Sequence, residues 1–221
     1  MISILELTAS SRGGGAVHIR DLVRALDRSR FAPVVAMAQD GGNVTAADFT
    51  NHGVPFHQLD IAGGPPLTAV VKLRVLLKQK SYDILHCHGA RAALPGRLAA
   101  LSLGDGRPRV LLSVHGFAAP HYGLPRRSIL LGIERALTPV TDAVICVSEV
   151  ERQDLLKAGF GPPERLRLVR HGIDAGRFRD VMVDRATQRA ALRVPADASL
   201  ITTICRLSVS YTHLRAHETK A

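Results

Sequence analysis

The chain begins with Ile2-Ser3-Ile4-Leu5-Glu6-Leu7-Thr8, which is followed by Gly13-Gly14-Gly15 and then by residues 18–26. The first run is short and apolar, as a buried strand is, and the last has apolar residues at helical spacing. Glycine has no Cβ, so the backbone can bend sharply there, while the unpaired N–H groups at a helix start attract an anion. The stretch therefore predicts a strand, a glycine turn and a helix, with a site for a negatively charged group at the turn.

The same rhythm continues along the chain, because further apolar runs alternate with segments of helical spacing. Several of these runs are continuous, which is typical of parallel strands buried on both faces. In one intervening segment, Leu94, Leu98 and Leu101 share a helix face. The strand candidates after the first are residues 33–38, 54–59, 83–87, 110–114, 143–147 and 166–169. The pattern predicts an α/β fold with a doubly wound, Rossmann-like parallel sheet and ligands at the carboxyl ends of its strands.

Composition limits the function classes. The 221 residues carry a net charge of +10, 4% aromatic residues and no tryptophan. The charges are dispersed and aromatic stacking platforms are scarce, so we expect no nucleic-acid partner. A basic surface also suits phosphate-bearing substrates or an anionic lipid face, which leaves peripheral membrane contact open.

The expected location follows from the apolar runs and the cysteines. No run approaches the roughly 20 apolar residues that cross a bilayer. The N-terminus has strand character and lacks the basic region of a secretory signal. Cys87, Cys146 and Cys205 lie far apart, each in or beside an apolar run, which predicts reduced core thiols. We therefore expect a cytoplasmic protein, with the inner face of the membrane as its other possible location.

Polar side chains stand at the ends of the later strand candidates. His88 ends the fourth run, His115 follows the fifth, and His171 follows the seventh. Ser148 follows the sixth, where its hydroxyl can cap a helix that starts near Glu149. The carboxyl ends of parallel strands meet at one edge of a sheet, so these side chains should converge near the glycine turn.

Two other kinds of nucleotide site fit the sequence less well. His18 stands where a G-x-G-x-x-G motif that starts at Gly13 requires glycine, which disfavours a nicotinamide oxidoreductase. The sequence also has no P-loop motif. His18 is then either a cleft residue or a helix-face residue packed on the sheet.

His86 and His88 flank Cys87, an order that could suggest a metal site. Successive side chains of a strand point to opposite faces, so Cys87 points away and the three cannot easily share one ion. We expect no metal and no cofactor. His86 is then a structural or cleft-edge residue, and His88, nearer the strand end, is the better candidate for contact with an acceptor.

Taken in order, these features resemble the acceptor-side, N-terminal domain of GT-B glycosyltransferases of family 4. The resemblance covers residues 2–208. It rests on five motifs, which are the glycine turn with Ala16-Val17-His18, the strand end Asp83-x-x-His-x-His, Val114-His115-Gly116-Phe117, Val147-Ser148-Glu149 and Gly172-Ile173-Asp174. A further segment, Ile204 to Ser208, resembles the start of the donor-binding domain, but Cys205 stands where the family has glycine and the usual Lys-Gly is missing.

The resemblance implies roles for the three glycines, Arg206 and His115. Gly13, Gly14 and Gly15 would approach the diphosphate of the donor, and Arg206 would be one of two cations that neutralise it as it leaves. His115 would lie beside the transferred sugar as the catalytic residue. The residues expected on the acceptor side of the cleft are His18, His88, Ser148 and Arg126. Family members generally need no metal for this step and retain the anomeric configuration of the sugar.

The predicted domain organisation follows from the resemblance and the charge pattern. Residues 1–174 form the acceptor-side domain, residues 175–198 a linker with a short helix over 185–192, and residues 199–208 the first strand of a truncated donor-binding domain. Residues 209–221 resemble a translated sequencing adapter, so the native reading frame is expected to end near Ser208. A short natural tail is the alternative.

The expected function is glycosyl transfer from a nucleotide-diphosphate sugar to a glycan, a lipid-linked molecule or a small molecule. On this interpretation residues 1–221 form a truncated and inactive fragment of the enzyme. The alternative is a Rossmann-like module that binds a phosphorylated ligand without turning it over.

Overall fold

The computed structural model describes residues 1–61, 66–117, 122–179 and 183–202. The chain divides into two compact units, Met1–Ile173 and Asp174–Ala221. The boundary lies beside residue 174, where the sequence predicts the end of the first domain.

The first unit is built on a seven-stranded sheet with the strand order β3-β2-β1-β4-β5-β6-β7. All neighbouring strands are parallel. The strands are β1 (Ile2–Thr8), β2 (Phe31–Met37), β3 (Phe56–Gln58), β4 (Ile84–His88), β5 (Arg109–Ser113), β6 (Ala143–Cys146) and β7 (Leu166–Leu168). Each lies within about two residues of its predicted run, and the doubly wound α/β fold is confirmed. The order of the strands reverses between β1 and β4, and a crevice for a ligand is expected outside the carboxyl ends at such a point.

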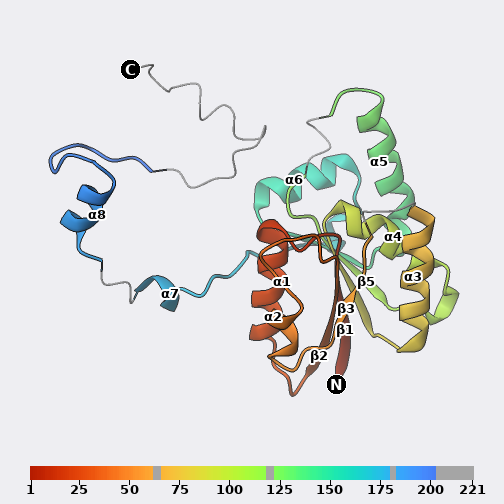
Figure 1. Ribbon diagram of the computed structural model, residues 1–221. Helices are drawn as coiled ribbons and strands as arrows, with labels where there is room; N and C mark the ends of the chain where they lie inside the picture. Colours follow the sequence, from red (N-terminus) through yellow and green to blue (C-terminus); the bar gives the residue numbers. More distant parts are fainter. Residues whose placement is uncertain (62–65, 118–121, 180–182, 203–221) are drawn as a thin grey trace. The chain divides into compact units, whose positions relative to one another are not determined.

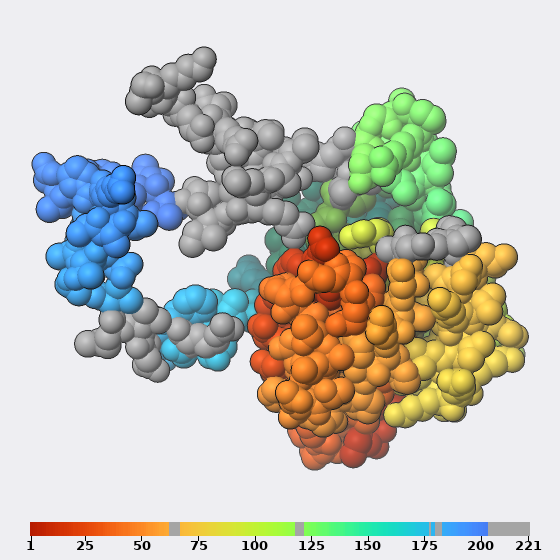
Figure 2. All heavy atoms as spheres, viewed as in Figure 1, coloured from red at the N-terminus to blue at the C-terminus, as the bar shows by residue number. Residues whose placement is uncertain are grey.

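Helices cover both faces of this sheet. They are α1 (Gly13–Ala25), α2 (Ala47–Thr50), α3 (Pro66–Gln79), α4 (Ala90–Leu101), α5 (Arg126–Leu137) and α6 (Glu149–Ala158). Helices α1 and α2 lie on one side of the sheet, and α3 and α4 lie on the other (Figure 1). Helix α5, green in Figures 1 and 2, projects at one end of the unit.

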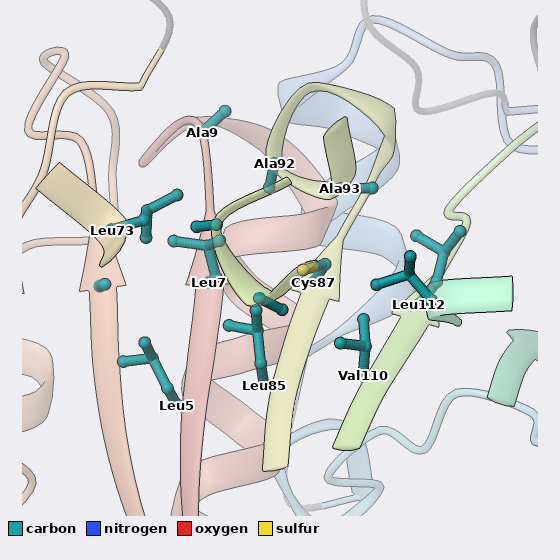
Figure 3. Close-up of a cluster of buried hydrophobic side chains, with 14 of the residues drawn as sticks. Leu5, Leu7, Ala9, Leu73, Leu85, Cys87, Ala92, Ala93, Val110 and Leu112 are labelled. Atoms are coloured by element: carbon teal, nitrogen blue, oxygen red, sulfur yellow. The ribbon is translucent and has the colours of Figure 1, made fainter. Parts of the chain in front are cut away.

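The larger hydrophobic core lies on the α4 side of the sheet. Apolar side chains of the central strands point into it, and the residues between them point to the other face. Leu7 of β1, Cys87 of β4 and Leu112 of β5 are buried in it together (Figure 3). The side chains next to them, Glu6 and His86, therefore point to the opposite face, and the parallel register places these two residues side by side.

Helix α4 buries a different face from the one that its leucines suggest. Leu101 is 53% exposed, whereas Ala93, Gly96 and Ala100 are buried against the sheet. A Cβ at Gly96 would lie 2.6 Å from Sγ of Cys87, so the helix approaches β4 closely only because it presents small residues there. The close approach, rather than leucine spacing, determines which face is buried.

Helix α1 begins earlier than the sequence predicts. It starts at Gly13, so the three glycines form its first turn rather than a turn before it. Gly13 has a φ of 78°, a left-handed conformation that favours glycine. The helix propensity of glycine is low, but the packing of the rest of α1 on the sheet overrides it at this position.

The second unit contains α7 (Gly176–Arg179) and α8 (Arg185–Ala191). Helix α8 corresponds to the predicted short helix. Asp184 caps it by accepting a 2.8 Å hydrogen bond from Thr187 N–H. Leu200 and Ile201 are exposed and lie outside any strand. The rest of the predicted strand, with Cys205 and Arg206, and the tail over 209–221 lie outside the described residues. Among the helices that the structure describes, none is long and apolar enough to span a bilayer.

Candidate active site

A pocket of about 380 Å³ opens at the carboxyl ends of the central strands. Residues from the ends of β1, β4 and β5 and from the first turns of α1 and α4 line it. They include Thr8, Arg12, Gly15, His88, Arg91 and His115. Of the three glycines, Gly15 lines this cavity together with His115, whereas Gly13 and Gly14 do not. A smaller hollow of about 270 Å³ near Met1 and Phe31 lies at the amino ends of β1 and β2 and contains none of the predicted site residues.

The loop that leads into α1 is fastened to the loop after β2. Asp40 accepts hydrogen bonds from the Ser10 hydroxyl at 2.7 Å and from the Ser11 backbone N–H at 2.9 Å. The hydroxyls of Ser11 and Ser10 hold the pKa of Asp40 well below its usual range. Arg12, the N-cap residue, donates to the Asp40 carbonyl through Nε at 2.9 Å and its side chain does not cap α1. The first N–H groups of the helix therefore have no side-chain cap, and Gly15 lines the pocket.

His115 adopts a backbone conformation that side chains rarely take, with a φ of 54°. A left-handed non-glycine residue costs free energy, and such residues concentrate at functional sites. The next residue, Gly116, donates its backbone N–H to Glu151 Oε1 at 3.0 Å, which holds the turn in place. His115 is half-buried and lines the pocket.

A chain of buried polar groups runs behind His115. Glu6 Oε2 lies 2.9 Å from His86 Nδ1 and 2.7 Å from His88 Nε2. His88 Nδ1 in turn lies 2.9 Å from His115 Nε2. The chain ends on the other side at Ser113, whose hydroxyl lies 2.9 Å from His86 Nε2. His86 is thus a structural residue, one of the two roles expected for it.

Burial and mutual contact determine the protonation states of these polar groups. Burial alone would raise the pKa of Glu6, but the adjacent His86 and His88 rings outweigh it and lower that pKa far below its usual range. Burial lowers the pKa of His88 to about 3, and nearby His86 contributes in the same direction. Burial, with His18 nearby, lowers the pKa of His115 to about 4. At neutral pH Glu6 is therefore a carboxylate, and His88 and His115 are neutral.

None of the sequence motifs includes Glu6 as a site residue. It is 1% exposed in the middle of an otherwise apolar strand. A charged residue inside a buried run needs a partner, and that cost is the only signal in the sequence that marks it. Its partners are 80 or more residues away in the chain.

Three imidazoles pack against one another, and His115 is the one of them that lines the pocket. The ring of His18 stacks on that of His171 with centroids 4.0 Å apart, and it lies 5.3 Å from the ring of His115. Burial and the neighbouring His171 lower the pKa of His18 to about 4, so it is neutral at physiological pH. His18 is not among the residues that line the pocket, so its place on the acceptor side of the cleft stays a prediction.

Two sets of side chains bring potential metal ligands together within the described residues, namely Glu6, His86 and His88, and His18, His115 and His171. In the first set hydrogen bonds already occupy every ring nitrogen. In the second set the rings of His18 and His171 are only 17° from parallel, so their lone pairs do not converge on one point. The expectation of no metal stays a prediction. Cys87 points to the other face, as the strand alternation predicts, and burial raises the pKa of its thiol to about 12.

The remaining predicted site residues lie around this pocket or apart from it. Ser148 caps α6 as predicted, because its hydroxyl accepts a 3.1 Å hydrogen bond from Glu151 N–H. Arg126 is exposed at the start of α5, with its guanidinium 4.0 Å from the ring centroid of Tyr122. Neither residue belongs to the described lining of the pocket.

Comparisons with known proteins show which chains this one is similar to. The family model described as Glycosyltransferase Family 4 matches residues 12–177. The UDP-Gal:alpha-D-GlcNAc-diphosphoundecaprenol alpha-1,3-galactosyltransferase of Escherichia coli is 26% identical over 144 residues, which are 64% of this chain and 36% of that protein. The D-inositol 3-phosphate glycosyltransferase of Thermobispora bispora is 25% identical over 163 residues, or 69% of this chain and 37% of that protein. The chain thus spans little more than a third of either relative.

A solved structure has the same fold. A glycosyltransferase from Rickettsia africae superposes with a TM-score of 0.69 at 16% identity, over 96% of this chain and 55% of that chain. MurG of Acinetobacter baumannii superposes with a TM-score of 0.52 at 17% identity, over 77% of this chain and 46% of that chain.

Proposed function

Because the chain belongs to glycosyltransferase family 4, we propose that its first unit is the acceptor-side part of an enzyme that transfers a sugar from a nucleotide-diphosphate sugar to an acceptor. The observation that carries this proposal is the pocket that the first turn of α1 shares with His115. One side of this pocket suits an anion and the other suits a neutral hydroxyl-bearing ring. A sugar diphosphate has both parts.

The diphosphate is the part of the donor that the first turn of α1 would hold. Its N–H groups and the positive end of the helix dipole favour a phosphate, and the absence of Cβ atoms at the glycines allows close approach. Arg206, which lies outside the described residues, is proposed as a second source of positive charge. Stabilising the leaving diphosphate in this way is electrostatic, so the proposal includes no metal. Retention of the anomeric configuration is proposed from the family resemblance alone.

His115 is proposed as the catalytic residue that contacts the transferred sugar. Its strained backbone and the hydrogen bond with His88 fix the ring where it lines the pocket. Replacing it by alanine should slow transfer by about 10²–10³-fold if it acts as a preorganised partner of the transition state. His18 and His88 would complete the wall of the cleft beside it.

The first residues of helix α5 and the segment just before it support the proposed contact with a membrane surface. Leu124 and Ile129 are 79% and 59% exposed, and Arg126 and Arg127 lie between them in the sequence. Apolar side chains flanked by cations suit an interface with anionic lipids. A lipid-linked acceptor presented at the cytoplasmic face would be reached from such a position. Binding to anionic vesicles that weakens in an Arg126→Gln, Arg127→Gln variant, with no binding to neutral vesicles, would support it.

The activity can be tested in a chimera in which residues 1–208 precede the donor-binding half of a family member. We expect release of the nucleotide diphosphate from one or more UDP-, GDP- or ADP-sugars when glycan or lipid-linked acceptors are supplied. His115→Ala should abolish most of it, whereas His57→Ala, which changes an exposed histidine of β3, should not. Residues 1–221 alone should bind weakly and transfer nothing.

The outcome that would overturn the proposal is a folded chimera that shows one unfolding transition but turns over none of these donors. If that chimera still bound inorganic pyrophosphate, the chain would be a binding module for a phosphorylated ligand instead.

A further inference from the structure

The hydrogen bonds among the buried polar groups next to His115 determine which atom of each group carries a proton. Hydrogen positions follow from which partner must donate and which must accept. Glu6, as a carboxylate, only accepts. His86 Nδ1 and His88 Nε2 both lie within 2.9 Å of Glu6 Oε2, so both nitrogens carry a proton. His86 Nε2 lies 2.9 Å from the Ser113 hydroxyl, which can either donate or accept, so this contact does not affect the proton on Nδ1.

The proton of His88 determines that of His115. A neutral imidazole carries one proton, and in His88 that proton is on Nε2, so its Nδ1 can only accept. The 2.9 Å contact between His88 Nδ1 and His115 Nε2 therefore requires the proton to lie on His115 Nε2. His115 Nδ1 is left with a lone pair, and among the described residues no side chain donates to it.

We propose that Glu6 and His88 are positioning residues that hold the proton of His115 on Nε2, so that Nδ1 faces the pocket as a hydrogen-bond acceptor for a ligand hydroxyl. The class of ligand group rests on the proposed function, but the proton positions do not. The order Glu6, His88, His115 forms a relay in which each member fixes the next.

A lone pair that faces the pocket favours different parts of the ligand at its two walls. A phosphate oxygen carries only lone pairs and would be repelled by Nδ1, whereas a sugar hydroxyl can donate to it. His115 would thus select the sugar, and the first turn of α1 would hold the diphosphate. The lowered pKa of His115 agrees with this assignment, because an imidazolium at this position would donate rather than accept.

The relay is tested directly by nuclear magnetic resonance of ¹⁵N-labelled residues 1–221 at pH 7.5. We expect His88 and His115 to carry their protons on Nε2 and His86 on Nδ1. We also expect a coupling across the hydrogen bond between His115 Nε2 and His88 Nδ1. A proton on His115 Nδ1, or an imidazolium at His88, would overturn the proposal without any variant.

Two variants separate the relay from the rest of the network. In Glu6→Gln the side-chain amide can donate to His88 Nε2, which would reverse the chain and move the His115 proton to Nδ1 in a measurable fraction of molecules. Ser113→Ala removes the partner of His86 on the other branch and should leave His115 unchanged. Equal effects of both variants on His115 would show that the ring senses general loosening of the core rather than Glu6. If Glu6→Gln does not fold, the wild-type proton positions still decide.

The ligand group is tested in the chimera with donors in which one sugar hydroxyl is replaced by fluorine. Fluorine cannot donate, so one position should lower kcat/KM by about 3- to 10-fold, the value of one hydrogen bond. That loss should be smaller in His115→Ala, in which only the electron-withdrawing effect of fluorine remains. A chimera without transfer would count against the proposed function and leave the relay standing, whereas wild-type transfer that is indifferent to every fluorine position would contradict the assigned acceptor role.

Discussion

The carboxylate of Glu151 accepts a hydrogen bond from the backbone N–H of Gly116 at 3.0 Å. Its other oxygen accepts from Val147 N–H at 2.9 Å, and the side chain is buried. One residue in the first turn of α6 therefore connects the turn after β5 to the end of β6. Because Gly116 follows His115, Glu151 also fixes the backbone from which the proposed catalytic ring projects.

Replacing Glu151 by glutamine should destabilise the fold. The amide keeps one acceptor, but its NH₂ group faces a backbone N–H that then has no partner. A buried donor left in this way costs about 1–3 kcal/mol. Urea unfolding of residues 1–221 measures the loss, and the amide resonance of Gly116 should shift with it.

Glu149→Gln is the matched control for this change. Glu149 lies in the same helical turn but is exposed. Its Oε1 lies 3.6 Å from Arg152 Nη1 and accepts a hydrogen bond from Gln153 Nε2. Surface pairs of this kind contribute about 0.5 kcal/mol or less. Equal losses in both variants would show that helix electrostatics, rather than the buried bonds of Glu151, stabilise this corner.

Gly96→Ala should also destabilise the protein, although alanine is the better helix former. The gain in helix propensity is about 1 kcal/mol. The new Cβ would lie 2.6 Å from Cys87 Sγ and 3.1 Å from Leu7 Cδ2, and overpacking of a core costs about 1–3 kcal/mol. Gly132→Ala in α5, where a Cβ meets nothing within 4 Å, should stabilise by up to about 1 kcal/mol. Thermal unfolding of the two variants should thus shift in opposite directions.

The case of Gly96 shows where sequence reasoning succeeds and where it stops. The strands could be predicted, because a parallel strand buried on both faces needs a continuous apolar run. The buried face of α4 could not, because leucine spacing does not reveal how closely a helix approaches a sheet. Glu6 was missed for a related reason, since its role depends on the register between β1 and β4 rather than on any local pattern. His115 and the glycines could be found because chain order alone places both at the carboxyl edge.

The pair Arg97 and Glu134 should be the most costly ion pair to break among those described. Arg97 is 1% exposed, its Nη2 lies 2.8 Å from Glu134 Oε2, and its Nε donates to the Ala93 carbonyl. Glu134→Ala leaves a buried guanidinium without its counter-charge, which costs about 3 kcal/mol or more. Arg109→Gln breaks a pair at 4.0 Å whose arginine side chain is exposed, and should cost about 1 kcal/mol or less. A loss below about 1 kcal/mol for Glu134→Ala in urea unfolding would mean that water or another group replaces the carboxylate.

The buried histidines should make the protein unstable in mild acid. Burial lowers the pKa of His18 and His115 to about 4 and that of His88 to about 3, compared with 6.5 in an unfolded chain. Between pH 6.5 and pH 4 the unfolded chain therefore binds more protons than the folded one, and protonation favours unfolding. The stability that these neutral rings contribute is complete above pH 6.5 and is lost as the pH falls through this window. Below about pH 4.5 the lowered pKa of Glu6 acts in the same direction.

Urea unfolding of residues 1–221 at several pH values measures this loss. The free energy of unfolding should fall by about 1.4 kcal/mol per pH unit, which is the value for one proton. Three histidines contribute, but His18 and His115 are partly exposed, so the contribution of each to the fall is reduced. His18→Asn should flatten the dependence, whereas His57→Asn, which removes an exposed histidine, should leave it unchanged. A constant stability between pH 7 and pH 5 would show that the rings at the pocket gain protons in the folded protein as readily as in the unfolded chain, and would contradict the neutral relay behind His115.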